Sequence, residues 1–405
     1  MIERRLKLPI PDHSFFLFGP RQTGKTTLVR KRLVGTEPSL EIDLLRHDLF
    51  LKYKTNPGRF RQEVDLYARM HSRATVFVDE IQKVPELLGE IHLLMEKHGR
   101  KLCFVLTGSS ARKLKRSAAN LLGGRAWSLS LHPLTHDELR SDLALDVALR
   151  FGTLPPVHGL EPEDAIRTLD AYSGIYVKEE VLGEALVRNV PAFGRFLELA
   201  ADSSGQTVNL SAVARETATA SRTIREYYQI LEDTLIALRL DPYLRSARKR
   251  IVTHPRYHLF DLGVTNGICG RLHDPVRSGT SLYGRLFEQF VVLEAHRSIN
   301  YSGLPWRMYH WRTSHGAEVD LVLERPGGAL YAIEIKSRSS IDPRDLTGLR
   351  QFLADYPHAR GACVCLAEHP YRQGGILFLP WRPFLEACSR GQFDEFERAD
   401  EDPAP

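Results

Sequence analysis

Residues 15–26 read Phe15-Phe16-Leu17-Phe18-Gly19-Pro20-Arg21-Gln22-Thr23-Gly24-Lys25-Thr26, an apolar run followed by a glycine-containing loop. The four leading apolar residues predict a short buried strand, and residues 26–33 predict a helix directly after the loop. Between the two lies the pattern G-x-x-x-x-G-K-T, whose backbone N–H groups surround a phosphate when it joins a strand to a helix. The sequence therefore predicts an α/β fold with a parallel sheet and a nucleotide-binding loop.

The residues of this loop have separate chemical roles. Gly19 and Gly24 let the backbone turn around the phosphates. Lys25 supplies a positive charge for the β- and γ-phosphates, and the Thr26 hydroxyl is placed to bind Mg²⁺. The following helix directs its positive dipole end at the same anion. We therefore expect ATP and Mg²⁺ as ligands, with nucleotide contacts from Gly19, Pro20, Arg21, Gln22, Thr23, Gly24, Lys25, Thr26 and Thr27.

A second apolar run, residues 75–78, ends in the carboxylates Asp79 and Glu80. This is the second half of an ATPase site, in which Asp79 holds Mg²⁺ through its waters and Glu80 polarises the attacking water. A third strand, residues 102–106, leads into Thr107 and Ser109. If it lies between the other two strands, these hydroxyls reach the γ-phosphate or the water; a simple polar turn is the alternative.

Arg125 follows two glycines in the segment Leu121-Leu-Gly-Gly-Arg125. One interpretation is an arginine finger that reaches the γ-phosphate of a neighbouring subunit. The other is an arginine that forms a structural ion pair within its own subunit.

The middle of the chain predicts a helix-turn-helix. Residues 210–217 and 221–231 form two helices joined by a tight turn, and the apolar positions of the second helix repeat on one face. A strand over residues 235–240 and a basic run then resemble a wing that contacts phosphate. The alternative is a winged helix used only for packing. The predicted DNA contacts are Arg222, Arg225, Gln229, Arg248, Lys249 and Arg250.

The C-terminal part holds a second cluster of charges. Residues 318–323 and 330–336 predict two strands of a hairpin centred on Gly327, which sets Asp320 opposite Glu334. Lys336 then shares their face, and Glu288 approaches from an upstream helix. Two facing carboxylates suit Mg²⁺, with Lys336 beside an attacking water. The alternative is a salt-bridge ladder on an exposed sheet face.

Charge is unevenly distributed along the 405 residues, whose formal net charge is +5. Residues 394–402 hold six acids and one arginine, so residues 1–393 carry about +10, which favours a polyanion partner. An acidic end of this kind is typical of a disordered tail. No apolar stretch has the length of a signal peptide or a membrane span, so we expect a cytoplasmic protein with no membrane partner.

The chain resembles AAA-type P-loop ATPases that carry a C-terminal domain of unknown function with a PD-(D/E)XK nuclease-like core. The resemblance rests on residues 18–28, 78–85, 106–110, 124–125 and 131–139, and on the C-terminal motifs at 284–288, 318–322 and 332–336. It implies an AAA-type core, a winged-helix middle and Arg125 as a finger acting in trans, hence a homo-oligomer such as a hexameric ring. The nuclease motif maps onto Glu288, Asp320, Glu334 and Lys336. The hinge at residues 151–155 departs from the family pattern by lacking a second glycine.

The sequence thus divides into a P-loop AAA-type core at 1–145, a helical lid or linker at 146–190 and a winged helix-turn-helix at 191–252. A nuclease-like α/β domain at 253–390 and an acidic disordered tail at 391–405 complete it. Together they predict an oligomeric ATPase that remodels or moves on DNA, with branched or structured DNA as partner. The alternative is an ATP-dependent regulatory switch, in which the winged helix and an inactive nuclease-like fold only bind DNA or protein.

Overall fold

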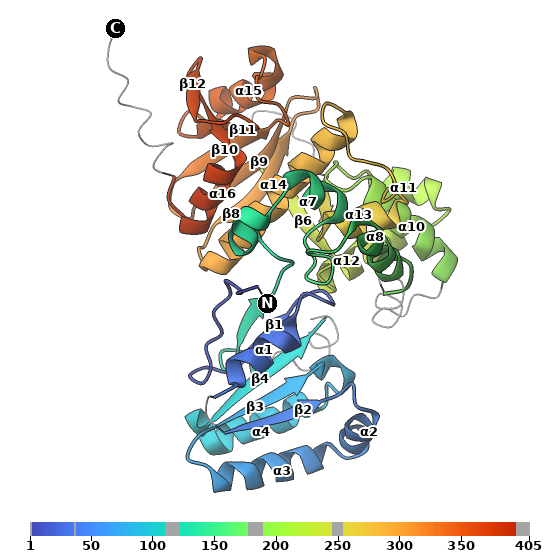
Figure 1. The fold of residues 1–405 in the computed structure, drawn as a ribbon, viewed down its shortest axis with the longest axis vertical. Helices are drawn as coiled ribbons and strands as arrows, with labels where there is room; N and C mark the ends of the chain where they lie inside the picture. Colours follow the sequence, from blue (N-terminus) through green and yellow to red (C-terminus); the bar gives the residue numbers. More distant parts are fainter. Residues whose placement is uncertain (1, 36–37, 110–121, 177–188, 245–253, 394–405) are drawn as a thin grey trace.

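The computed structural model describes residues 2–35, 38–109, 122–176, 189–244 and 254–393. They form two lobes (Figure 1), which we call the N-terminal lobe, residues 2–130, and the C-terminal lobe, residues 131–393. The N-terminus lies at the junction between them. The basic run Arg248, Lys249 and Arg250 and residues 394–405 of the predicted tail lie outside the described residues. The tail was predicted to begin at residue 391, but Phe393 is buried in the core of the C-terminal lobe.

The N-terminal lobe is built on one parallel sheet of five strands in the order β2-β3-β4-β1-β5. The parallel sheet predicted from the sequence is confirmed, and β4 lies between β1 and β3 as the placement of Thr107 requires. The strands are β1 (Phe15–Phe18), β2 (Ser39–Asp43), β3 (Ala74–Asp79), β4 (Leu102–Gly108) and β5 (Trp127–Ser130).

Strand β1 is buried on both sides, which explains its unbroken apolar run. Phe16 and Phe18 belong to a core formed with helices α2, α3 and α4, whereas Phe15 and Leu17 pack toward α1 and the N-terminal segment. Parallel strands covered on both faces have this composition. The helices are α1 (Lys25–Leu33), α2 (His47–Thr55), α3 (Pro57–Met70) and α4 (Leu87–His98), with 3₁₀ turns η1 (Ile81–Lys83) and η2 (Gly99–Lys101).

The C-terminal lobe contains a mixed sheet of eight strands in the order β12-β13-β11-β10-β9-β8-β6-β7. Helices α14 and α16 share a core with one face of this sheet, and α15 covers the other face. The strands are β6 (Ala237–Pro242), β7 (Arg256–Leu259), β8 (Arg307–Arg312), β9 (Glu318–Glu324), β10 (Leu330–Ile335), β11 (Arg360–Cys365), β12 (Tyr371–Gln373) and β13 (Ile376–Pro380).

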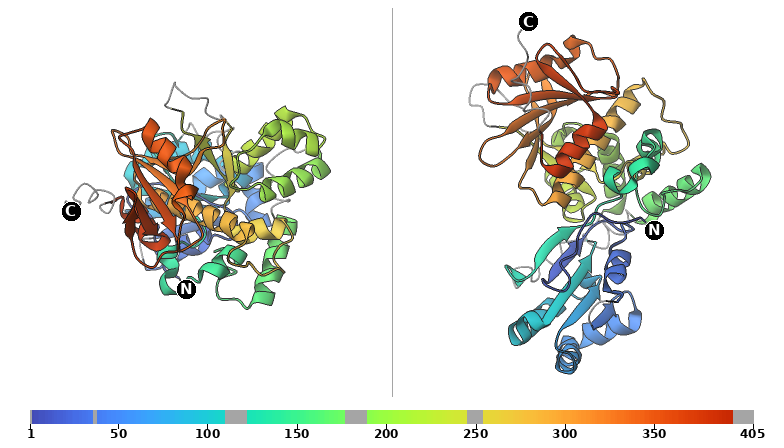
Figure 2. Two further views of the ribbon diagram at one scale, coloured as in Figure 1. Left: turned by 90° about the horizontal axis from the view of Figure 1, so that it is seen from above. Right: turned by 60° about the vertical axis from the view of Figure 1, so that its left-hand side comes forward.

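The same lobe holds a group of helices beside the sheet, seen to one side in the left view of Figure 2. Helices α10, α12 and α13 form a core of their own with strand β7. The helices of the lobe are α6 (His136–Leu139), α7 (Leu145–Phe151), α8 (Pro162–Ala171), α10 (Val190–Asp202), α11 (Leu210–Glu216), α12 (Ser221–Asp233), α13 (Leu262–Ile268), α14 (Ser281–Ser302), α15 (Thr347–Asp355) and α16 (Trp381–Arg390). Short turns are η4 (Arg140–Asp142), η5 (Tyr172–Tyr176) and η6 (Pro343–Leu346).

Strand β6 joins the middle of the chain to the C-terminal sheet. It pairs with β7 as an antiparallel hairpin and, at Asp241 and Pro242, with β8 in parallel. The boundary predicted at residue 252 therefore falls inside the β6–β7 hairpin, and β7 packs with the helices of the middle region. Sheet hydrogen bonds make the two predicted domains continuous.

A buried ionic network joins the segment after β5 to helix α14. Arg297 donates to the carbonyl oxygens of Leu134 (3.4 Å) and Phe260 (2.7 Å) and to Glu294 (2.6 Å). Glu294 also accepts from the backbone N–H of His136 at 2.8 Å and lies 3.1 Å from its Nδ1. Glu294 is fully buried, so these bonds supply the partners that a buried carboxylate requires. Every described helix is too short or too polar to traverse a lipid bilayer.

The raised pKa of His136 predicts that the fold loses stability at alkaline pH. Burial alone would lower its pKa, but hydrogen bonds and charge from Asp137 and Glu294 raise the pKa to about 9. An unfolded histidine titrates near pH ~6.5, so the stabilisation is fully present below that pH and is lost as the pH rises through about 9. We expect the melting temperature to fall across this window.

The control variants separate His136 from other groups that titrate in the same range. His136→Gln should flatten the pH dependence, whereas His158→Gln, a change at an exposed histidine, should keep it. Thermal unfolding followed by circular dichroism measures both. An unchanged pH dependence in His136→Gln would assign the effect to other residues.

Candidate functional site

The phosphate loop connects β1 to α1 at the carboxyl edge of the N-terminal sheet. Gly24 has a φ of +91°, which side chains disfavour, and a Cβ on Gly19 would lie 2.3 Å from the carbonyl oxygen of Leu131. Both motif glycines are therefore required by the backbone. Lys25 is buried, and its ammonium donates to the carbonyl oxygens of Gly19 (2.7 Å) and Pro20 (3.0 Å).

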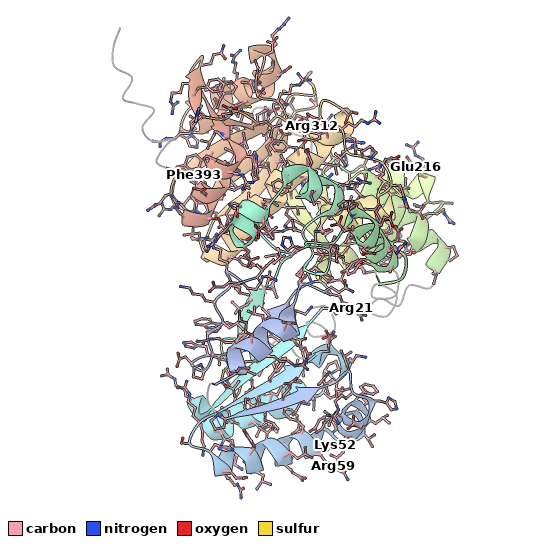
Figure 3. All side chains as sticks on the ribbon, viewed as in Figure 1. Arg21, Lys52, Arg59, Glu216, Arg312 and Phe393 are labelled. Carbon is pink, nitrogen blue, oxygen red and sulfur yellow. The ribbon has the colours of Figure 1, made fainter. Side chains whose placement is uncertain are left out.

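Other residues of the loop are held by contacts of their own. The Thr23 hydroxyl donates to the Pro20 carbonyl oxygen at 2.9 Å, and Gln22 has a φ of +63°. Tyr172 of the C-terminal lobe donates to the Arg21 carbonyl oxygen at 3.1 Å. Figure 3 shows Arg21 where the two lobes meet. The loop is thus shaped partly by residues outside the motif.

Three strands bring the predicted magnesium and water ligands together. Thr26 donates to one oxygen of Asp79 at 2.8 Å, and Thr107 donates to the other. Burial raises the pKa of Asp79, although these two hydrogen bonds act in the opposite direction. A hydroxyl beside a buried carboxylate at a phosphate loop fits Mg²⁺, which takes such ligands together with nucleotide oxygens and water.

Glu80 is held by a residue that sequence reasoning missed. It adopts left-handed backbone angles, φ 58° and ψ 47°, and its N–H donates to the Thr107 hydroxyl at 3.2 Å. The side-chain amide of Gln82 donates to the Glu80 carboxylate and to Ser109 at 3.1 Å. The signal in the sequence that could have identified Gln82 is its position two residues after Glu80. In this arrangement the Glu80 carboxylate, which is expected to polarise water, accepts a hydrogen bond from the side-chain amide of Gln82.

Arg125 lies on the surface near helix α4. Its guanidinium is 2.6 Å from His92 Nδ1 and 3.2 Å from Glu96, and its side chain is 44 % exposed. The structure therefore shows the ion pair that was the alternative interpretation. The exposed position leaves the role of a finger toward a second subunit as a prediction.

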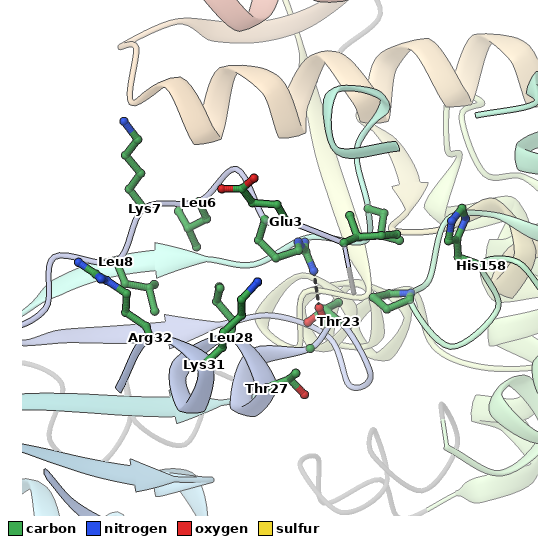
Figure 4. A pocket seen from close by; sticks show the side chains of 15 residues that line it. Glu3, Leu6, Lys7, Leu8, Thr23, Thr27, Leu28, Lys31, Arg32 and His158 are labelled. Atoms are coloured by element: carbon green, nitrogen blue, oxygen red, sulfur yellow. Dashed lines mark hydrogen bonds between the residues drawn. The ribbon is translucent and has the colours of Figure 1, made fainter. Parts of the chain in front are cut away.

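A cavity of about 960 Å³ opens beside the phosphate loop (Figure 4). The cavity is surrounded by the N-terminal segment 2–8, by helix α1 and by residues 155–158. Sequence reasoning missed this pocket because its walls come from segments far apart in the chain. Its apolar lining residues are Ile2, Leu6, Leu8, Leu28, Leu134 and Pro155, and Thr23, Gly24 and Thr27 connect it to the phosphate loop.

The predicted DNA-binding helix is α12, which follows α11 after a short turn. Ile224, Tyr228 and Leu231 are buried, while Arg222 and Gln229 are exposed. Arg225 is also exposed. Acidic neighbours reduce the positive charge of this face, since Arg222 lies 3.5 Å from Glu226 and Gln229 donates to Asp233 at 3.2 Å.

The C-terminal cluster has the predicted register. Leu321 pairs with Ile333 and Val322 with Ala332, which sets Asp320 opposite Glu334. Lys336 donates to Glu334 at 2.5 Å. Asp320 accepts from the backbone N–H of Ile335 at 2.9 Å, so one of its oxygens is used within the sheet.

Arg256, which sequence reasoning did not single out, lies within this cluster. Its guanidinium is 2.9 Å from Glu288, 3.1 Å from Glu318 and 3.6 Å from Asp320. Burial and the charge of Asp320 raise the pKa of Glu288 despite this arginine. Burial likewise raises the pKa of Glu334.

Among the described residues, no group of three or more histidine, cysteine or acidic side chains is placed to hold a metal ion. The guanidinium of Arg256 lies between Glu288 and Asp320, where a cation would bind. Asp320 and Glu334 are buried, so the cluster is not an exposed ladder. The magnesium site at Glu288, Asp320 and Glu334 stays a prediction.

Comparison with known families gives three matches along the chain. Residues 12–140 match the family described as AAA domain. Residues 144–272 and 283–384 match two domains of unknown function, DUF8612 and DUF4143. The first match supports a P-loop ATPase family for the N-terminal lobe and suggests ATPase activity with ATP and Mg²⁺, the ligands that AAA domains generally use.

Similar proteins leave the activity open. Uncharacterized proteins of Mycobacterium tuberculosis and Mycobacterium bovis are each 29 % identical over 364 residues, covering 88 % of this chain and 77 % of theirs. An uncharacterized protein of Haemophilus influenzae is 25 % identical over 239 residues, covering 54 % of this chain and 57 % of its own.

One solved structure aligns with much of the chain. It is the ORC1 protein of Aeropyrum pernix in complex with DNA, at 14 % identity and a TM-score of 0.28. The alignment covers 64 % of this chain and 86 % of that protein. At this score the likeness carries no argument about fold or function.

The position of Arg256 among the carboxylates predicts how a divalent metal ion changes the stability of the C-terminal cluster. Arg256→Gln should lower the free energy of unfolding by about 3–5 kcal/mol, because removal of one partner leaves buried carboxylates uncompensated. Mn²⁺ should restore part of this loss in the variant and leave the wild type unchanged. Urea unfolding with and without Mn²⁺ measures the effect.

Arg312→Gln is the matched control for this experiment. Arg312 lies 3.5 Å from Glu318 and is 40 % exposed, so its loss should cost less than about 1 kcal/mol. Equal stabilisation of wild type and Arg256→Gln by Mn²⁺ would show that the guanidinium does not take the place of a metal.

Proposed function

We propose that the protein hydrolyses ATP as an oligomer and uses this energy to remodel DNA or to move on it. The observation that carries the proposal is the meeting of Lys25, Thr26, Asp79 and Thr107 at one edge of the sheet, with Glu80 next to them. These are the side chains that hydrolysis of a Mg²⁺–nucleotide requires.

Each side chain then has one role in the reaction. Lys25 leaves the loop carbonyls and neutralises the β- and γ-phosphates. Thr26 and Asp79 would hold Mg²⁺, which would supply positive charge beside the transferred phosphoryl group. Glu80 accepts a hydrogen bond from the attacking water. The hydrogen bond from the Gln82 amide to the Glu80 carboxylate must therefore break first. Thr107 and Ser109 contact the γ-phosphate or the water.

The cavity beside the loop suits the base and ribose of the nucleotide. It adjoins Thr23, Gly24 and Thr27, and its apolar walls match a flat nucleobase better than they match water. Its volume of about 960 Å³ leaves room for the base, the sugar and solvent.

DNA binding is supported by the exposed arginines of α12 and by the β6–β7 hairpin that follows this helix. A helix-turn-helix followed by a hairpin is a common arrangement for reading or gripping a duplex. Arg125, exposed on the N-terminal lobe, is our candidate for completing the site of a neighbouring subunit.

A regulatory switch is the second candidate function, and Arg256 favours it. A guanidinium among Glu288, Glu318 and Asp320 opposes metal-dependent cleavage of DNA at this cluster. The C-terminal sheet would then act as a binding platform, and the nucleotide state would set the conformation of the two lobes.

The ATP site is tested by two substitutions with different expected results. Lys25→Ala should abolish nucleotide binding, since the phosphates lose their main counter-ion. Glu80→Gln should keep binding but lower kcat by about 10²–10⁴-fold, because only the activation of water is removed. Nucleotide affinity and steady-state phosphate release measure the two effects. Wild-type turnover by Glu80→Gln would show that another group activates the water.

A mixing experiment extends the same test to Arg125. If Arg125 acts in trans, inactive Arg125→Ala and inactive Lys25→Ala subunits should regain activity when mixed, since an intact loop then meets an intact finger. No recovery in mixtures that co-assemble, as checked by analytical ultracentrifugation, would limit Arg125 to its own subunit.

DNA binding is tested by charge removal on α12. Arg222→Ala combined with Arg225→Ala should weaken duplex binding and flatten the slope of log K against log[salt] by about two. Arg59→Ala combined with Arg69→Ala, on helix α3, removes equal charge elsewhere and should leave the slope unchanged. DNA that raises kcat supports remodelling, whereas DNA that changes only nucleotide affinity supports the switch.

A further inference from the structure

Arg4 holds the phosphate loop from outside the nucleotide-binding motif. Its guanidinium donates to the carbonyl oxygen of Thr23 at 2.7 Å and to that of His132 at 2.6 Å. It also donates to the Glu138 carboxylate at 3.0 Å and to the Tyr301 hydroxyl at 3.2 Å. The Arg4 side chain is only 8 % exposed, so all four bonds are shielded from water. Figure 4 shows the bond to Thr23.

The bond to Thr23 fixes the direction of a neighbouring N–H group. In a trans peptide the carbonyl and the following N–H point in opposite directions. Because Arg4 holds the Thr23 carbonyl on its own side, the N–H of Gly24 points away from Arg4. The charge of the guanidinium also polarises this peptide, which makes its N–H a better donor to an anion.

Arg4 is in turn held by the C-terminal lobe. The Tyr301 hydroxyl on α14 accepts from Arg4 and from the backbone N–H of His132 at 2.9 Å. Glu138 accepts from Arg4 and also bonds the backbone N–H of Thr135 at 3.0 Å, which caps helix α6. The position of the guanidinium therefore depends on how α6 and α14 are docked.

We propose that Arg4 is a positioning residue for the phosphate loop, and that it makes the affinity for nucleotide phosphates depend on the docking of α14. This proposal rests on the proposed nucleotide binding. Undocking of α14 removes the Tyr301 partner, frees the guanidinium and lets the Thr23–Gly24 peptide rotate. Conversely, a bound diphosphate that accepts a hydrogen bond from the Gly24 N–H fixes the Thr23–Gly24 peptide. It thereby stabilises the hydrogen bond from Arg4 to the Thr23 carbonyl oxygen, since coupling between two sites is reciprocal.

Arg5 provides a matched control for a merely structural role. It fastens the same segment through Asp137 and through Ser389 of α16, to whose carbonyl oxygen it donates at 2.8 Å. The contacts of Arg5 do not include the phosphate loop among the described residues. A general loosening of the N-terminal segment should therefore appear equally in both variants.

The experiment compares ADP with adenosine, which lacks phosphates, using the full-length chain. Arg4→Gln should raise the Kd for ADP by about tenfold, the loss of one charge-assisted hydrogen bond. The affinity for adenosine should fall by less than the affinity for ADP, although Arg4 also lines the cavity proposed for the base. Arg5→Gln should bind both ligands as the wild type does. Calorimetry measures ADP directly, and adenosine is measured by competition.

Two further variants keep the test decisive if Arg4→Gln fails to fold. Arg4→Lys retains the charge and should recover part of the ADP affinity. Tyr301→Phe should weaken ADP binding by about threefold and have a smaller effect when Arg4→Lys is already present, since both act on one contact.

Unchanged ADP affinity in the Arg4 variants would overturn the proposal, and so would equal losses in Arg4→Gln and Arg5→Gln or an equal loss for adenosine. A wild-type chain that does not bind ADP, or that binds it no better than Lys25→Ala, would instead overturn the proposed nucleotide site, on which this role of Arg4 depends.

Discussion

The guanidinium of Arg297 is the constraint on which the arrangement of the C-terminal lobe around helix α14 depends. It binds carbonyl oxygens at Leu134 and Phe260, the Thr153 hydroxyl and the carboxylate of Glu294. These groups come from the segment after β5, the hinge, the segment after β7 and helix α14. Because the arginine and Glu294 are buried, loss of either would leave an uncompensated charge, which costs far more than a surface ion pair.

The same segment after β5 connects this network to the phosphate loop. His136 binds Glu294, and Glu138, two residues further along α6, binds Arg4 and Arg5. Helix α14 thus reaches the loop through Tyr301 and Arg4, and it holds the segment after β5 through Arg297 and Glu294. A nucleotide-dependent change in the loop therefore has a direct physical route to the sheet of the C-terminal lobe, whether the protein remodels DNA or acts as a switch.

The two clusters of acidic residues differ in what balances their charge. In the N-terminal lobe, Asp79 is bonded by the hydroxyls of Thr26 and Thr107, neutral donors that leave its negative charge available to a metal. In the C-terminal lobe, the guanidinium of Arg256 and the ammonium of Lys336 already lie against Glu288, Asp320 and Glu334 and offset part of their charge. This difference is the physical basis for preferring nucleotide hydrolysis over DNA cleavage as the chemistry of the protein.

The local elements could be predicted from the sequence, because the loop motif, the strand pattern and the hairpin register depend on neighbours in the chain. The same is true of the parallel sheet, the contact of Thr26 with Asp79, and Asp320 opposite Glu334. The distant cations and amides that complete each site depend on tertiary packing. No sequence periodicity predicts the contacts of Arg4, Arg256 and Gln82. Packing of the two lobes places Arg4 at the phosphate loop, and the β6–β7 pairing places Arg256 beside Glu288. The left-handed backbone at Glu80 places its carboxylate beside Gln82.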